Sequence, residues 1–234
     1  MVFFLTKDDF VFLGRNLHRP ECVLATKSGD VFASHAADRG GIAQIEVNGR
    51  TNFIMATAGD IPDDFIPNGY SLMPDGSFLI ANVGNDGGVY TLNRDGTLVP
   101  FLLEIDGIKL PACNFANRDE LGRIWISVST WARNRDESFK KDVADGVIIL
   151  VDNKGSRVAA QGIGLQMKIR WILQGNGFSS MRQWEGRFAG FQSVVMVNWV
   201  TKKCMQNMVL EFSQMALSLM LKVVFGVLVS LVIE

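Results

Sequence analysis

The sequence contains three similar units in succession, and this repeat restricts the possible folds more than any other feature. The units open with SGDVFAS, PDGSFLIAN and ELGRIWIS. Their first turn glycines are 47 and then 46 residues apart, at Gly29, Gly76 and Gly122. Each unit continues with a second apolar run and closes at a turn, at Asn48-Gly49, Asp95-Gly96 and Lys154-Gly155.

These units have the pattern of β-propeller blades. Asp-Gly and Asn-Gly pairs supply the positive φ angles that tight hairpin turns require. The runs between the turns are short and rich in Val, Ile, Phe and Tyr, which favours strands. A period of about 40 to 50 residues with four such runs per unit is typical of propeller blades. We therefore expect an all-β fold with about three blades.

The composition changes abruptly near Gly164. Residues 1–164 hold 16 Lys and Arg against 21 Asp and Glu, whereas residues 165–234 hold 7 against 3. The final stretch, MALSLMLKVVFGVLVSLVI, is almost wholly apolar, and Lys222 is its only charged residue. We therefore expect two parts, a propeller segment over residues 10–164 and a different, hydrophobic tail over residues 165–234.

The whole-chain composition excludes some functions and compartments. A net charge of −1 over 234 residues argues against a protein that binds nucleic acid by neutralising phosphates. Cys22, Cys113 and Cys204 are far apart and odd in number, which favours reduced thiols over a disulfide framework. The N-terminal residues MVFFLTKDDF have too short an apolar run for a secretory signal peptide. We therefore expect a cytoplasmic protein.

The motifs at blade spacing resemble those of a known family. RPECVLATKSGDVFAS, IPNGYSLMPDGSFLIAN and NFANRDELGRIWISVST resemble the regucalcin (senescence marker protein)/gluconolactonase/LRE-like family of six-bladed β-propellers. The combination of RPE, PNG and NxxxxDxxGRxW is more specific than any one turn. The resemblance covers about residues 10–164 and implies a partial six-bladed propeller. Family members hydrolyse lactones or related esters with a divalent metal, usually calcium, in the central channel.

The resemblance also implies roles for particular residues. Glu21 matches the first metal-binding glutamate of the family, and Asn114 matches an asparagine near both metal and substrate. Asn68 holds the corresponding entry to the second blade, where it would face the substrate in the same channel. Carboxylate and amide oxygens suit calcium, and calcium could polarise a lactone carbonyl. Many family members carry an arginine where this sequence has Ala112, which weakens the case for substrate anchoring there.

Each candidate residue also has a purely structural interpretation. Glu21 could be a surface carboxylate, Asn68 a turn residue and Asn114 a loop amide that caps a strand. Cys113 fits a small buried position, and Trp125 and Phe78 fit blade packing. His18 and His35 are too few and too far apart in the sequence to suggest a triad or a zinc site. We name no catalytic nucleophile or base.

The tail carries later family motifs only in a shifted reading frame. When each codon starts at the third base of the preceding one, QMKIRWILQGNGFSSMR permits NENSVDPAGKWFFVNET. At the same offset, SQMALSLMLKVVFG permits PDGLVFDVEGGVW. We infer that residues 165–234 are an out-of-frame translation of later blades. The family's second metal-binding asparagine and its later aspartate are then absent.

Three functions follow from these observations. The first is a calcium-dependent lactonase or ester hydrolase that is truncated and inactive because two metal ligands are missing. The second is a propeller-derived module that binds a small lactone or ester without catalysis. The third is a fragment anchored in a membrane by residues 215–233, whose length suffices but whose Lys222 is costly within a bilayer.

Overall fold

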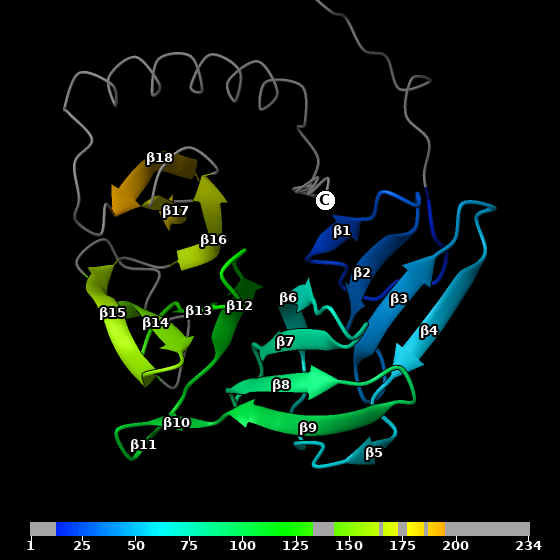
Figure 1. The fold of residues 1–234 in the computed structure, drawn as a ribbon, viewed down its shortest axis with the longest axis horizontal. Coiled ribbons are helices and arrows are strands. Elements are labelled where there is room, and N and C mark those ends of the chain that lie inside the picture. Colours follow the sequence, from blue (N-terminus) through cyan, green and yellow to red (C-terminus); the bar gives the residue numbers. More distant parts are fainter. Residues whose placement is uncertain (1–12, 133–142, 164–165, 173–176, 185–186, 195–234) are drawn as a thin grey trace, which may run out of the picture.

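The computed structural model describes residues 13–132 and 143–163 in full, and the backbone of residues 166–172, 177–184 and 187–194. This described part of the chain contains strands and no α-helix, so the expected all-β fold is confirmed. Four blade-like sheets follow one another along an arc (Figure 1).

Each of the three predicted blades is an antiparallel sheet with its strands in sequence order. The first blade consists of β1 (Val23–Ala25), β2 (Val31–His35), β3 (Gly41–Ile45) and β4 (Thr51–Met55). The second consists of β6 (Pro67–Leu72), β7 (Phe78–Asn82), β8 (Val89–Leu92) and β9 (Thr97–Leu102), and short β5 (Ala58–Gly59) pairs parallel to β9. The third consists of β12 (Cys113–Arg118), β13 (Ile124–Val128), β14 (Gly146–Asp152) and β15 (Gly155–Ile163). A hairpin of β10 (Glu104–Ile105) and β11 (Ile108–Lys109) joins the second blade to the third.

The repeated glycines occupy the hairpin turns for which the sequence predicts them. Each has a left-handed φ between 80° and 96°, and they are Gly29, Gly49, Gly76, Gly96, Gly122 and Gly155. Side-chain carboxylates stabilise the same turns, because Asp75 accepts the backbone N–H of Ser77 and Asp95 accepts that of Thr97. The hydrogen bonds from the hydroxyl and backbone N–H of Ser77 lower the pKa of Asp75, and those from Thr97 lower the pKa of Asp95. The repeat in the sequence therefore reflects the regular spacing of the hairpin turns, which require these glycines.

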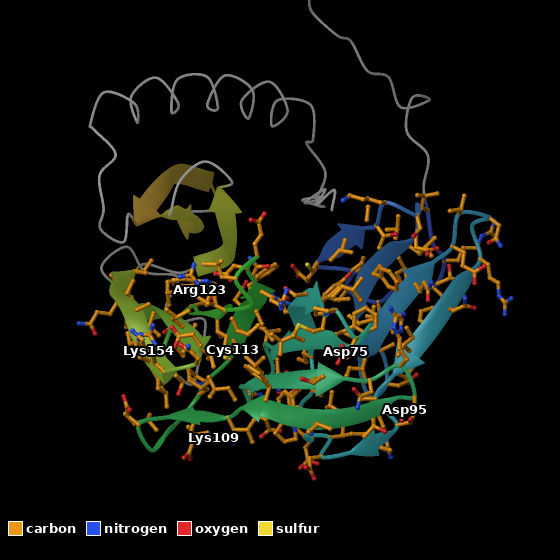
Figure 2. All side chains as sticks on the ribbon, in the orientation of Figure 1. Asp75, Asp95, Lys109, Cys113, Arg123 and Lys154 are labelled. Carbon is orange, nitrogen blue, oxygen red and sulfur yellow. The ribbon has the colours of Figure 1, made fainter. Side chains whose placement is uncertain are left out.

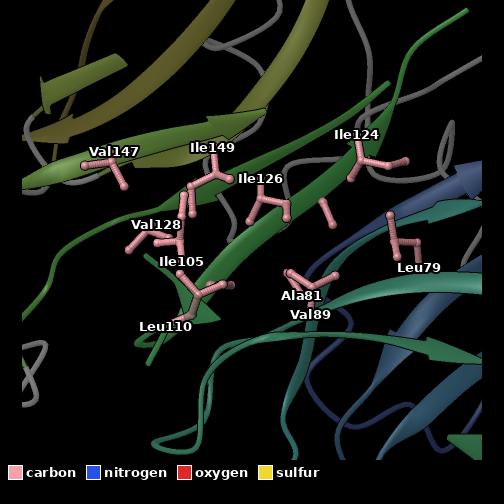
Figure 3. Close-up of a cluster of buried hydrophobic side chains, with 12 residues drawn as sticks. Leu79, Ala81, Val89, Ile105, Leu110, Ile124, Ile126, Val128, Val147 and Ile149 are labelled. Atoms are coloured by element: carbon pink, nitrogen blue, oxygen red, sulfur yellow. The ribbon is translucent and has the colours of Figure 1, made fainter. Parts of the chain in front are cut away.

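The second blade is buried on both faces, which explains its continuous apolar runs. Phe78 and Ile80 of β7 pack toward the first blade, against a cluster that includes Phe32 and Ile42. The alternate residues of β7, Leu79 and Ala81, pack toward the third blade. The partners there come from β13, β14 and the β10–β11 hairpin, and include Ile124, Ile126, Val128, Val147, Ile149 and Ile105 (Figure 3). Successive strand residues point to opposite faces, so one strand joins two inter-blade cores.

A fourth sheet follows the third blade, where the sequence predicts no blade. It contains β16 (Gln166–Ile172), β17 (Gly177–Trp184) and β18 (Arg187–Val194), which pair antiparallel in that order. Strand β16 contacts β12 and β13. Apolar and basic residues alternate from Met167 to Trp171 within β16, a pattern that favours a strand. The out-of-frame interpretation concerns the nucleic acid and stays a hypothesis.

The remaining predictions for the tail lie outside the described residues. Residues 195–234, which include the proposed membrane anchor at 215–233, belong to this group. Within the described residues, no helix has the length and apolarity needed to cross a membrane.

Candidate functional site

The three candidate residues lie at equivalent places, where the innermost strands of successive blades begin. Glu21 lies two residues before β1, while Asn68 and Asn114 are each the second residue of their strands, β6 and β12. Strand β6 contacts both β2 and β12. The side-chain Nδ2 of Asn68 donates a hydrogen bond to the backbone carbonyl of Asn114, at 2.8 Å. The structure therefore brings the entries of the second and third blades into direct contact.

Arg19 joins the first blade to this contact. Its Nη1 donates a hydrogen bond to Oδ1 of Asn68 at 3.3 Å, and its Nη2 lies 3.3 Å from Oε1 of Glu21. Asn68 and Asn114 are buried, with 7% and 6% of their surfaces exposed. The side chains of Arg19 and Glu21 are 40% and 41% exposed. The site is thus a series of polar contacts that runs from the exposed Arg19–Glu21 ion pair to the buried Asn68 amide and the backbone carbonyl of Asn114.

Glu21 is held in place through its backbone. The backbone N–H groups of Glu21 and Cys22 both donate to Oγ of Ser34, at 3.0 and 3.1 Å. The Glu21 N–H also lies 2.9 Å from the carbonyl oxygen of Arg19, across Pro20. Ser34 is fully buried on β2, so the sheet of the first blade fixes the position from which Glu21 projects.

Both asparagines lie at irregularities of their strands. The register of β6 against β7 shifts between Pro67 and Tyr70, and that of β12 against β13 shifts between Cys113 and Phe115. Such β-bulges turn a side chain away from the regular alternation and are common beside functional sites. Each asparagine lies inside one of these shifts.

Gly69 permits the close approach of β6 and β12. A Cβ atom at this position would lie 2.7 Å from the carbonyl oxygen of Asn114 and would overlap the ring of Phe115. The glycine of the PNG motif is therefore required by the contact between two inner strands. This contact is the one that carries the Asn68–Asn114 hydrogen bond.

Asp119 organises the hairpin that leaves the site along β12. Its Oδ1 accepts the backbone N–H groups of Leu121 and Arg123, at 3.0 and 2.9 Å. Its Oδ2 accepts Nε of Arg123 at 2.6 Å and Nε1 of Trp125 at 2.9 Å. Arg123 is labelled in Figure 2 beside this hairpin. Burial alone would raise the pKa of Asp119, but the hydrogen bonds from Trp125 and Arg123 outweigh it and lower the pKa.

In the described site, Arg19 already contacts side-chain oxygens of Glu21 and Asn68. Within this part of the chain, no three His, Cys, Asp or Glu side chains are grouped so that they could hold a metal ion. Glu21 is paired with Arg19, and both polar atoms of the Asn68 amide are already engaged. Calcium takes six to eight oxygen ligands. The expected roles of Glu21 and Asn114 as metal ligands therefore remain predictions.

Sequence reasoning missed the role of Arg19 and the contact between the two histidines. Arg19 belongs to the RPE motif, but its motif position does not show where its side chain points. The backbone N–H of His18 donates to Nδ1 of His35 at 3.1 Å, and their ring centroids are 6.0 Å apart. They line a hollow of about 330 Å³ with Phe53 and Asp38. The expectation that they form no zinc site stays a prediction.

Two structural interpretations from the sequence are confirmed. Phe78 is buried in the cluster between the first and second blades, and Trp125 is buried in a cluster of third-blade residues. Cys113 is fully buried, and its burial raises the pKa of its thiol to about 12. This cysteine, which precedes Asn114, is labelled on β12 in Figure 2 and serves packing.

Comparisons with known proteins show similarity at the level of the fold. No protein-family model and no curated protein matches the chain. Among solved structures, a gluconolactonase from Xanthomonas campestris matches with a TM-score of 0.55 and 14% identity, over 74% of this chain and 56% of that one. An oxidoreductase of the glucose dehydrogenase type from Thermus thermophilus matches with a TM-score of 0.50 and 12% identity, over 78% of this chain and 62% of that one.

The chain thus spans less than two thirds of the length of either structure. Identities this low establish the fold and carry no activity across. The described sheets are blades of a β-propeller of the kind found in gluconolactonase, as the motifs at blade spacing indicate.

Proposed function

We propose that the chain binds a small lactone or related ester at the entry of the inner strands. The observation that carries this proposal is the position of Asn68, whose amide joins Arg19 of the first blade to Asn114 of the third. Polar groups from three blades thus converge at one end of the propeller. A lactone is proposed as the ligand class by analogy with a gluconolactonase of similar fold.

The chemistry of the site suits an uncharged, oxygen-rich ring. The guanidinium of Arg19 and the carboxylate of Glu21 balance each other in charge and offer donors and acceptors side by side. A lactone presents carbonyl and ring oxygens as acceptors, and its hydroxyl groups can donate to a carboxylate. A neutral ligand avoids the charge repulsion that Glu21 would impose on a carboxylate or phosphate.

The function that competes with binding alone is calcium-dependent hydrolysis of the same ligand. The similarity to a gluconolactonase favours it, whereas the engagement of Glu21 and Asn68 by Arg19 disfavours it. Hydrolysis would require metal ligands in addition to those that the described site supplies. We therefore infer binding without turnover as the function of this chain.

Calorimetric titration of the full chain with gluconolactone tests the proposal. We expect saturable binding, and we expect Asn68→Ala to weaken it at least tenfold because the bridge between blades is lost. Asn48→Ala is the matched control, since Asn48 lies in an exposed hairpin turn of the first blade and should leave affinity unchanged. Absence of binding, or equal loss in both variants, would overturn the assignment of the site.

A lactone-hydrolysis assay with added calcium separates the two functions. Turnover that Glu21→Ala abolishes would establish a metal-dependent hydrolase and refute binding alone. Binding with no turnover above the spontaneous rate would support the non-catalytic function.

A further inference from the structure

The guanidinium of Arg19 occupies the place where a cation would meet the oxygen atoms of this site. It lies 3.3 Å from Oε1 of Glu21 and 3.3 Å from Oδ1 of Asn68. Glu21 is the residue for which the family resemblance predicts a metal ligand, and Asn68 is the one predicted to face the same channel. In this arrangement both oxygens already have a positively charged partner.

We propose that Arg19 is the built-in cation of the site and excludes divalent metal from Glu21. The guanidinium neutralises the carboxylate, satisfies the Asn68 oxygen and would repel a second cation placed beside it. Calcium could bind only after Arg19 had moved away and left both oxygens. The inference concerns the same site as the proposed function, but it does not depend on the identity of the organic ligand.

The backbone around Arg19 is arranged for this contact. Arg19 has a φ of 48°, in the left-handed region that a residue with a side chain rarely adopts. Such conformations persist where the surrounding structure imposes them, and they are frequent at functional sites. Pro20 restricts the next φ angle, and the Glu21 N–H lies 2.9 Å from the Arg19 carbonyl. This tight turn brings the side chains at positions 19 and 21 together.

The position of the Arg19 guanidinium between Glu21 and Asn68 matters more here than the strength of the Arg19–Glu21 ion pair. The side chains of Arg19 and Glu21 are 40% and 41% exposed, so solvent screens their attraction and an isolated pair of this kind is weak. The additional hydrogen bond to buried Asn68 fixes the guanidinium plane across the site. A guanidinium has five N–H groups, so these two contacts leave others able to donate to a carbonyl oxygen. Arg19 can thus serve as the polarising cation for the ligand.

The test measures metal binding by the full chain in the absence of lactone. Terbium luminescence and calcium competition are recorded for the wild type and for Arg19→Gly, because glycine accepts the positive φ at this position. We expect no saturable binding of calcium below millimolar concentration in the wild type, and at least tenfold tighter binding in Arg19→Gly. Adding Glu21→Gln to Arg19→Gly should abolish the gain.

Arg15→Gly is the matched control, since Arg15 is an exposed arginine of the same segment and its loss changes the net charge equally. Arg19→Asn is the second variant, because asparagine tolerates left-handed backbone, and it keeps the test valid if the glycine variant folds poorly. Tight calcium binding by the wild type, no gain in either Arg19 variant, or an equal gain in Arg15→Gly would each overturn the proposal. Because no lactone is present, the result is independent of the ligand titration.

Discussion

Replacement of Asp119 should remove a large share of the stability of the third blade. The carboxylate is buried, with 5% of its side chain exposed, and it accepts four hydrogen bonds from Leu121, Arg123 and Trp125. In Asp119→Ala these donors lose their acceptor. Trp125 is 2% exposed, so water cannot readily replace the carboxylate at its indole N–H.

The magnitude follows from the environment of each donor. Breaking a buried charged pair costs about 3–5 kcal/mol. The Arg123 side chain is 31% exposed and can turn toward water, so we expect the lower end, about 3 kcal/mol, for Asp119→Ala. Asp119→Asn keeps one oxygen but presents an NH₂ group to two donors. Unsatisfied buried donors cost about 1–3 kcal/mol each, so we expect about 2 kcal/mol for this variant.

Urea denaturation followed by tryptophan fluorescence measures both losses. Asp75→Asn is the matched control, because Asp75 occupies the corresponding turn of the second blade but is exposed, and it should shift the midpoint much less. The pKa of Asp119 is lowered in the folded state, so its contribution is full above the unfolded-state pKa, about 4, and declines as the pH falls further. The difference between wild type and Asp119→Asn should therefore shrink below that pH. Equal midpoints for the two proteins at pH 7 would refute this account.

Three further predictions concern packing and ionisation. Gly69→Ala should lower the free energy of unfolding by about 2–3 kcal/mol, because its Cβ would overlap Phe115; an unchanged urea midpoint would exclude the close approach of the strands. Cys113, whose burial raises its pKa to about 12, should resist iodoacetamide at pH 8 until urea is added, as peptide mass spectrometry can show; rapid native labelling would contradict its burial. Burial, together with the neighbouring His18, lowers the pKa of His35 although Asp38 opposes the shift, so the unfolded state binds the proton more readily and stability should fall as the pH drops through about 6.5. The melting temperature should fall less between pH 7.5 and 5.5 in His35→Gln, and equal slopes would count against this role of the imidazole.

The propeller blades could be predicted because the turns carry the information. Gly29, Gly76 and Gly122 have positive φ angles that few other residues accept, and their spacing states the length of each blade. The continuous apolar runs between these glycines indicate strands that are buried on both faces of the sheet, as β7 is. The fourth sheet was not predicted, because the composition changes at residue 165 and the turn signals cease. The alternation of apolar and basic residues along β16 also indicates a strand, but this signal is weaker than the turn glycines of the first three blades.

The candidate residues at the inner strands could be predicted only as positions. Their motif spacing places Asn68 and Asn114 at equivalent entries, and the structure brings these entries together. The register shifts at the two asparagines depend on pairing with β7 and β13, which no local pattern in the sequence specifies. Gly69 is an example, because a side chain at this position is excluded by Phe115, a residue of another blade.

A sequence motif can identify the Glu21 carboxylate and still not reveal that the Arg19 guanidinium lies beside it. The resemblance assigns Glu21 to a metal because it compares residue types at matched positions. Whether the carboxylate is available depends on the direction of a neighbouring side chain, and that direction follows from the left-handed backbone at Arg19. A residue with a side chain gives no sequence signal for such a backbone, whereas glycine does.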